Sequence, residues 1–195
     1  MATKIIIGLA GSLRKGSLNA MLLRAAAEKM SQLGSGRDVT LEIASIRGIP
    51  LYDGDVEAAE GIPSAVRALK DRIAQADGLL LATPEYNNSI PGVFKNAIDW
   101  LSRPPDDAAR VFANRPVAVM GATPGRMGTV LAQAAWLPVF HTLGMRPWLG
   151  ARLLVSGAGK VFDASGQITD DHVAKQLETF LAGFAAFVAE TPAIR

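Results

Sequence analysis

Residues 11–19 read Gly-Ser-Leu-Arg-Lys-Gly-Ser-Leu-Asn, and this stretch decides how the rest of the chain is interpreted. Residues 4–9 before it are almost all apolar, as in a buried strand, and helically spaced apolar residues begin near Leu18. Glycine permits tight turns, and the free N–H groups at the start of a helix attract anions. A strand-loop-helix unit rich in hydroxyl, amide and guanidinium groups is therefore predicted to bind a phosphate.

The familiar phosphate motifs do not describe this loop. It lacks the lysine that a P-loop places between its last glycine and the hydroxyl residue, and Gly8 and Gly11 are wrongly spaced for a dinucleotide fingerprint. What remains is a cradle for a single phosphate, built mainly from hydroxyls and amides. The alternative is a simple Gly/Ser turn in which Arg14 and Lys15 are solvated.

Composition limits the possible functions. The 195 residues, 49% of them hydrophobic and 19% charged, predict one globular domain over residues 1–195. A net charge of +2 is too small for a nucleic-acid-binding surface, which would carry a dense basic stripe. The chain has no cysteine, so thiol redox chemistry is excluded and any redox work needs a bound cofactor. His141 and His172 lack ligand partners nearby in the sequence, and we expect no metal site.

Nothing in the sequence predicts a targeting signal or a membrane span. The N-terminus lacks the charged and apolar regions of a signal peptide. The longest apolar run, residues 180–189, is far shorter than the roughly 20 residues needed to cross a bilayer. We therefore expect a cytoplasmic protein.

Strand and helix patterns alternate along the chain. The expected strands are residues 4–9, 39–43, 79–82, 117–120 and 152–155. The first expected helix begins near residue 18 and ends at Gly34-Ser35-Gly36. Further helices are expected at residues 66–73, within residues 89–101, around residues 129–143 and at residues 172–190. Residues 46–63 are predicted to be irregular, and residues 102–115 to be a polar connector. Such alternation predicts an α/β domain with a five-stranded parallel sheet, in the order 2-1-3-4-5, and helices on both faces.

In this topology ligands bind at the carboxyl ends of strands 1, 3 and 4. The second loop at this edge is residues 83–89, Thr-Pro-Glu-Tyr-Asn-Asn-Ser. Asn87 and Asn88 tolerate unusual backbone angles, while Tyr86 offers a flat face and Asn87 an amide, as a planar heteroaromatic ring with polar edges requires. The alternative is a helix-capping turn with a surface tyrosine. We interpret Glu85 as a positioning group or the partner of a cation.

The third loop, residues 121–128, brings Thr123-Pro124-Gly125-Arg126 to the same edge. Backbone amides and the Arg126 cation beside such a ring would favour its negatively charged reduced form. The alternative is that Arg126 is simply solvated at the start of a helix. No residue of the chain is predicted to be catalytic by itself, because the cofactor would carry the chemistry.

With these loops described, the chain resembles the NADPH-dependent FMN reductase family of flavodoxin-like proteins, and most of all its branch of bacterial quinone and chromate reductases. The resemblance covers nearly the whole chain. Its motifs lie in residues 11–19, 49–53, 84–92, 95–100 and 125–126. One departure is the fourth helix, where residues 134–138 are apolar and Pro138 is predicted to kink or end the helix.

The resemblance implies a set of FMN-binding residues. Those implied to hold the phosphate are Ser12, Arg14, Ser17, Leu18 and Asn19. Those implied to border the ribityl chain and the isoalloxazine ring are Pro84, Glu85, Tyr86 and Asn87. Those implied to lie near the far edge of the ring are Thr123, Pro124, Gly125 and Arg126, the last as a stabiliser of the reduced flavin.

The resemblance also implies an activity, in which NADPH or NADH reduces bound FMN and the electrons pass to quinones, with chromate as a further acceptor. Family members are homodimers or homotetramers built as dimers of dimers. Two alternatives are a flavodoxin-type electron carrier, which a sequence pI of about 9.1 argues against, and an FMN-binding regulator without turnover. The sequence does not choose between NADH and NADPH, between dimer and tetramer, or between fixed and exchanging FMN.

Overall fold

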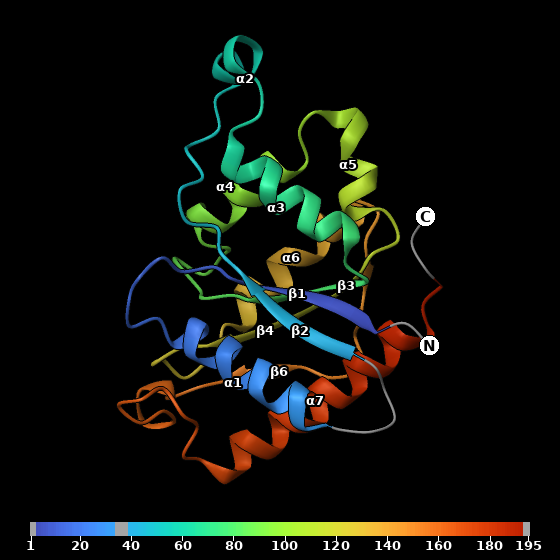
Figure 1. Ribbon diagram of the computed structural model, residues 1–195. Coiled ribbons are helices and arrows are strands. Elements are labelled where there is room, and N and C mark those ends of the chain that lie inside the picture. Colours follow the sequence, from blue (N-terminus) through green and yellow to red (C-terminus); the bar gives the residue numbers. More distant parts are fainter. Residues whose placement is uncertain (1–2, 34–38, 193–195) are drawn as a thin grey trace.

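The computed structural model describes residues 3–33 and 39–192. Its centre is a parallel sheet in the order β2-β1-β3-β4-β5, with β6 also paired to β4 (Figure 1). The strands are β1 (Lys4–Ala10), β2 (Val39–Ala44), β3 (Gly78–Ala82), β4 (Pro116–Ala122), β5 (Arg146–Pro147) and β6 (Leu153–Val155). The predicted α/β class and the order 2-1-3-4-5 are confirmed.

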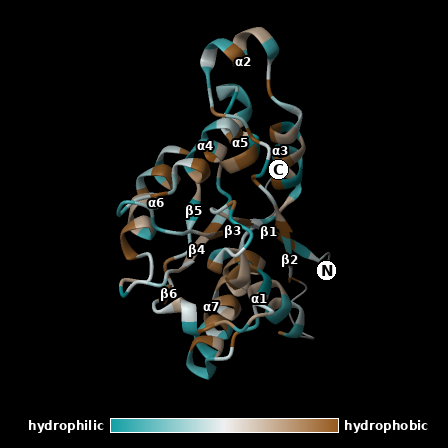
Figure 2. Cartoon of the chain, turned by 90° about the vertical axis from the view of Figure 1, so that its left-hand side faces the viewer, coloured by the Kyte–Doolittle hydropathy of each residue, from teal (hydrophilic) through white to brown (hydrophobic). Residues whose placement is uncertain are grey.

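Helices cover both faces of the sheet, as predicted. The helices are α1 (Leu18–Gln32), α2 (Gly54–Glu60), α3 (Ser64–Gln75), α4 (Gly92–Leu101), α5 (Pro105–Phe112), α6 (Val130–Thr142) and α7 (Asp171–Glu190). One apolar core lies between the sheet and α1 and α7, and a second lies between the sheet and α3 to α6. Figure 2, coloured by the hydropathy of each residue, shows hydrophobic residues in the sheet and on the helices that cover it.

Burial follows the strand order. β3, in the middle of the sheet, is buried at every residue, as its continuous apolar sequence predicts. β2 lies at the edge, where its two end residues are buried and the residues between them are partly or fully exposed. The residues of α7 predicted to face inward are all buried; they are Val173, Leu177, Phe180, Leu181, Phe184 and Val188. The layers place the carboxyl ends of β1, β3 and β4 beside one another.

Two helices were missed by the sequence interpretation. α2 lies within residues 46–63, which were predicted to be irregular, and none of its residues is buried. It projects from the body of the molecule (Figures 1 and 2) and begins where the Asp53 side chain accepts a hydrogen bond from the Asp55 amide. α5 lies within the predicted connector and buries Val111 and Phe112.

The helix expected within residues 89–101 covers Gly92–Leu101, after a tight turn at residues 86–89. Two other features differ from the expectations. The strand expected at residues 152–155 is β6, and β5, which also pairs with β4, was not expected. α6 continues through Pro138 to Thr142, so the proline does not end the helix. The predicted stop of α1 at residues 34–36 lies outside the described residues.

No helix within residues 3–33 and 39–192 is long and apolar enough to cross a membrane.

Candidate functional site

The loop after β1 presents unpaired amides at the start of α1. Ser17 caps this helix, its Oγ accepting a hydrogen bond from the Ala20 amide at 3.2 Å. The amides of Leu18 and Asn19, the first two of the helix, have no acceptor among the residues that the structure describes. These N–H groups and the helix dipole make the start of α1 a favourable place for an anion.

A glycine allows this loop to approach its neighbours closely. A Cβ atom on Gly11 would lie 2.1 Å from a ring carbon of Phe94, which is fully buried in α4. The Gly11 amide donates to the Ala82 carbonyl at 2.9 Å, extending the pairing of β1 and β3 into the loop. Any larger residue at this position would therefore push the loop away from the end of β3.

Arg14 is a free cation on this loop. Its backbone amide lies 3.4 Å from the Ser12 Oγ, which accepts from it. The Arg14 guanidinium has no hydrogen bond or ion pair within the described part of the chain. It is therefore available to an anionic ligand, for which its planar fork of donors is suited.

Asn19 braces the site internally. Its side chain is 3% exposed, and its Nδ2 donates to the Ala122 carbonyl at 2.8 Å while its Oδ1 accepts from the Ala122 amide at 2.9 Å. The side-chain amide thus ties the start of α1 to the end of β4. The Asn19 backbone amide is the group that remains unpaired.

The loop after β3 is a two-residue hairpin. Tyr86 and Ser89 exchange backbone hydrogen bonds at 3.1 and 3.0 Å, and Asn87 and Asn88 between them have φ angles of 49° and 61°. Positive φ at both central residues defines a turn that favours asparagine, so the prediction of unusual backbone angles here is confirmed. Tyr86 is 43% exposed, and its hydroxyl lies 3.5 Å from the Ser12 Oγ.

Glu85 reaches from this loop to the start of α6. Its Oε2 accepts hydrogen bonds from the amides of Leu131 at 2.8 Å and Ala132 at 3.0 Å. Thr129, the N-cap residue, has a left-handed backbone and caps no amide with its own side chain. Glu85 therefore caps a helix, which agrees with its interpretation as a positioning group and not with that of a partner to a cation.

The loop after β4 is held against the end of the sheet by close packing. A Cβ on Gly121 would lie 1.9 Å from the Thr129 Oγ1, and the Thr123 amide donates to the Val155 carbonyl at 2.9 Å. Thr123 Oγ1 accepts a hydrogen bond from the Gly125 amide at 3.2 Å. Arg126 is exposed, and its side chain has no bonded partner in residues 3–33 or 39–192.

The three loops surround one hollow of about 120 Å³, which we call the polar hollow. Its lining residues are Ser12, Arg14, Ser17, Leu18, Asn19, Pro84, Glu85, Tyr86, Ala122, Thr123 and Pro124. Every residue singled out from the sequence is among them except Asn87, Gly125 and Arg126. Ala122 was missed because it is a small apolar residue at the end of a strand. Only the three-dimensional structure shows that it lies beside the loops.

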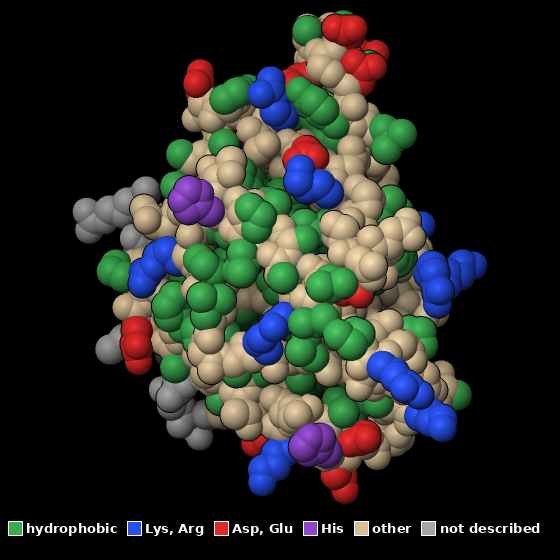
Figure 3. Space-filling view, turned by 180° about the vertical axis from the view of Figure 1, so that it is seen from behind, with side chains coloured by type: hydrophobic (Ala, Val, Ile, Leu, Met, Phe, Trp, Pro, Cys, Tyr) green, Lys and Arg blue, Asp and Glu red, His purple; other side chains and the backbone are tan. Residues whose placement is uncertain are grey.

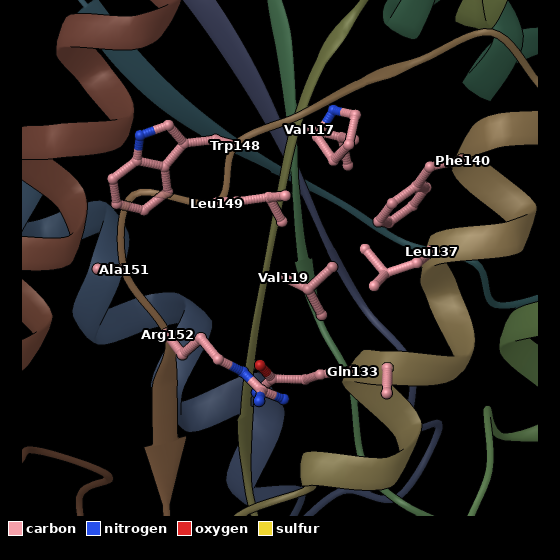
Figure 4. A pocket seen from close by; sticks show the side chains of 11 residues that line it. Val117, Val119, Gln133, Leu137, Phe140, Trp148, Leu149, Ala151 and Arg152 are labelled. Carbon is pink, nitrogen blue, oxygen red and sulfur yellow. The ribbon is translucent and has the colours of Figure 1, made fainter.

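A larger hollow of about 210 Å³, the apolar hollow, lies between β4, α6 and residues 147–152 (Figure 4). Phe140, Trp148 and Val119 form part of its wall, and Gln133 and Arg152 lie at one end. Hydrophobic side chains also gather around a hollow on the back of the molecule (Figure 3). The apolar hollow contains none of the residues predicted to bind a ligand, and we assign the candidate site to the polar hollow on its chemistry.

No group of three or more His, Cys, Asp or Glu side chains that could hold a metal ion occurs among the described residues. The charged groups of the polar hollow are Arg14 and Glu85. The arrangement suits a ligand that carries an anionic group at one end and a planar, polar-edged group at the other.

Comparison with known proteins shows the family to which the chain is similar. The family model described as NADPH-dependent FMN reductase matches residues 5–160. An NAD(P)H-dependent FMN reductase of Pseudomonas aeruginosa is 40% identical over 183 residues, covering 94% of each chain. A 2-hydroxy-1,4-benzoquinone reductase of a Burkholderia species is 37% identical over 190 residues, covering 97% of this chain and 98% of the relative.

Solved structures agree with the sequence relatives. FerB, a flavoenzyme NAD(P)H:(acceptor) oxidoreductase of Paracoccus denitrificans, superposes with a TM-score of 0.81 at 34% identity, covering 95% of this chain and 97% of its own. The family match covers most of the chain, and the two sequence relatives each exceed 30% identity over nearly all of it. The chain therefore belongs to the NADPH-dependent FMN reductase family.

Proposed function

We propose that this protein is an FMN-dependent oxidoreductase that takes electrons from NAD(P)H and passes them to quinones. The observation that carries the proposal is the convergence of three loops, with unpaired amides and a free arginine, at the carboxyl ends of β1, β3 and β4. Family membership supports FMN as the cofactor, and relatives named as quinone reductases support quinones as the acceptors.

The residues present fit FMN. The phosphate would lie at the start of α1, against the free amides of Leu18 and Asn19, the hydroxyls of Ser12 and Ser17, and Arg14. An exposed tyrosine face and the hairpin amides would border the ring and the ribityl chain. The residues proposed for that border are Pro84, Glu85, Tyr86, Asn87, Thr123, Pro124, Gly125 and Arg126.

When bound, FMN supplies the electron-transfer chemistry. The chain supplies binding, orientation and charge. Arg14 and the start of α1 would hold the phosphate end, and the hydrogen-bonded hairpin at residues 86–89 would border the ring. Arg126, which has no partner in the described part of the chain, would lie near the far edge of the ring and stabilise negative charge there.

The finer parts of the proposal concern the substrates and the assembly. We propose that NADPH or NADH serves as donor, that quinones are the main acceptors and that chromate is an adventitious one. We further propose a homodimer or a dimer of dimers that works in the cytoplasm, where NAD(P)H is available. A flavodoxin-type carrier or an FMN-binding regulator remains the alternative function.

One experiment separates these functions. The absorption spectrum of the purified protein is recorded, and NADPH and then a quinone are added without oxygen in the same cuvette. Bound yellow flavin that bleaches with NADPH and recovers with the quinone is the expected result. Flavin that stays oxidised with both NADPH and NADH would favour the carrier or the regulator, and a protein that cannot be reconstituted with FMN would overturn the site.

A further inference from the structure

Glu85 joins two of the three loops of the polar hollow. Its carboxylate caps α6, which follows the loop after β4, although Glu85 itself belongs to the loop after β3. We propose that Glu85 is a positioning residue that fixes these two loops relative to each other around the flavin. We propose also that its negative charge lowers the reduction potential of the flavin. The proposal rests on the proposed function, since it concerns the same cofactor.

α6 needs a cap from outside because its own start provides none. Thr129 has a φ of 65° and makes no side-chain cap, and the first turn of α6 contains no acidic residue. α7 differs, because Asp170 directly before it accepts a hydrogen bond from the Val173 amide at 3.0 Å. The backbone amides at the start of a helix have no acceptors within the helix. The Glu85 carboxylate accepts hydrogen bonds from two such amides of α6.

This cap connects the helix to the ligand site. Glu85 lines the polar hollow together with Thr123 and Pro124 of the neighbouring loop. The Thr129 side chain lies close against Gly121, so the start of α6 contacts the end of β4. Loss of the Glu85 cap would therefore loosen residues 123–129 on the side where the ring is proposed to lie.

The charge of Glu85 acts in addition to its hydrogen bonds. A helix start carries a partial positive charge, and a carboxylate placed there offsets it. A flavin gains negative charge on reduction, so a nearby carboxylate opposes that reduction and a neutral residue does not. Glu85→Gln keeps an oxygen that can accept both hydrogen bonds while removing the charge, so this variant separates the two effects.

The test uses Glu85→Gln, Glu85→Ala and, as a matched control, Asp170→Ala, which removes the cap of α7 and no residue of the polar hollow. Three quantities are measured in each protein. They are the hydrogen exchange of the Leu131 and Ala132 amides without FMN, the affinity for FMN, and the midpoint potential of the bound flavin.

We expect Glu85→Ala to speed exchange at both amides and to weaken FMN binding about tenfold, the scale set by losing hydrogen bonds to a charged group. Glu85→Gln should keep both amides protected and FMN affinity within about threefold, while the midpoint potential becomes more positive. Asp170→Ala should destabilise the fold without changing FMN affinity or potential.

Unchanged exchange at Leu131 and Ala132 in Glu85→Ala would overturn the cap. Equal losses of FMN affinity in Glu85→Ala and Asp170→Ala would overturn the positioning role, since general destabilisation would explain both. An unshifted potential in Glu85→Gln would overturn the role of the charge. A wild-type protein that binds no FMN would instead overturn the proposed function and the flavin roles built on it, and the exchange data would still decide the cap.

Discussion

The polar hollow and the apolar hollow both include residues of β4 or of the loop after it, but their linings differ in chemistry. The apolar hollow is larger, about 210 Å³ against about 120 Å³, and is walled by residues such as Val119, Leu137 and Phe140. The polar hollow is bordered by backbone amides and by an arginine side chain that have no partner in residues 3–33 and 39–192. Of these two hollows, the smaller is the candidate site, because backbone amides at a helix start and an arginine converge on it, as the binding of an anion requires.

The two hollows also show two different roles of buried amide side chains. Asn19 beside the polar hollow and Gln133 beside the apolar hollow are both buried and both bond to a strand carbonyl. Asn19 fixes the free amides at the start of α1, while Gln133 fixes α6 to β6. The same chemistry therefore braces the candidate site in one place and, in the other, links α6 to β6 and to the Thr129 Oγ1 at 3.3 Å.

Two arginines provide the largest expected contrast. Arg14 lines the polar hollow with no bonded partner in the described residues, and Arg152 lines the apolar hollow and donates to the Val130 carbonyl at 3.2 Å. Arg14→Ala should weaken FMN binding about 10- to 100-fold, because a charge-assisted contact to phosphate contributes about 1.5–3 kcal/mol. The affinity is measured by titrating the FMN-free protein with FMN and following quenching of flavin fluorescence.

Arg152→Ala is the matched control and should leave FMN affinity unchanged. Equal losses in the two variants would break the assignment of the site to the polar hollow. Loss of NAD(P)H oxidation in an Arg14→Ala protein that binds FMN normally would contradict the phosphate role given to Arg14.

The two buried amides give the next contrast. Asn19→Ala leaves the backbone groups of Ala122 unpaired and should lower the free energy of unfolding by about 2 kcal/mol. Gln133→Ala should cost a similar amount, since it leaves the Leu153 carbonyl without this partner. Urea denaturation measures both losses. FMN affinity should fall several-fold in Asn19→Ala alone, because only that variant frees the start of α1.

Much of the fold could be predicted because its signals are local. The continuous apolar run of β3 and the periodic apolar residues of α7 indicate a buried parallel strand and a covering helix. α2 and α5 were missed because each is short, and α2 buries no residue that could create a period. Pro147 in β5 also conceals a strand, since a proline cannot donate to a sheet and occurs mainly at edges.

The loops of the candidate site could be predicted from the sequence, but the contacts that connect them could not. Glycines and asparagines mark turns locally, so the loops themselves could be found. The Asn19 side chain bonds a residue 103 positions away, and Glu85 caps a helix 46 positions away. Such partners depend on the packing of the whole sheet, and no local pattern of residue types indicates them.

Tyr86 offers the smallest and most specific test of the polar hollow. Its hydroxyl lies 3.5 Å from the Ser12 Oγ, at the limit of a hydrogen bond, while its ring is exposed beside the hollow. Tyr86→Phe should therefore change FMN affinity by about twofold or less, whereas Tyr86→Ala should weaken it further by removing the flat face. The same fluorescence titration compares the two variants. Equal losses in both would assign the effect to the hydroxyl and would mean that the ring of the flavin does not lie against Tyr86.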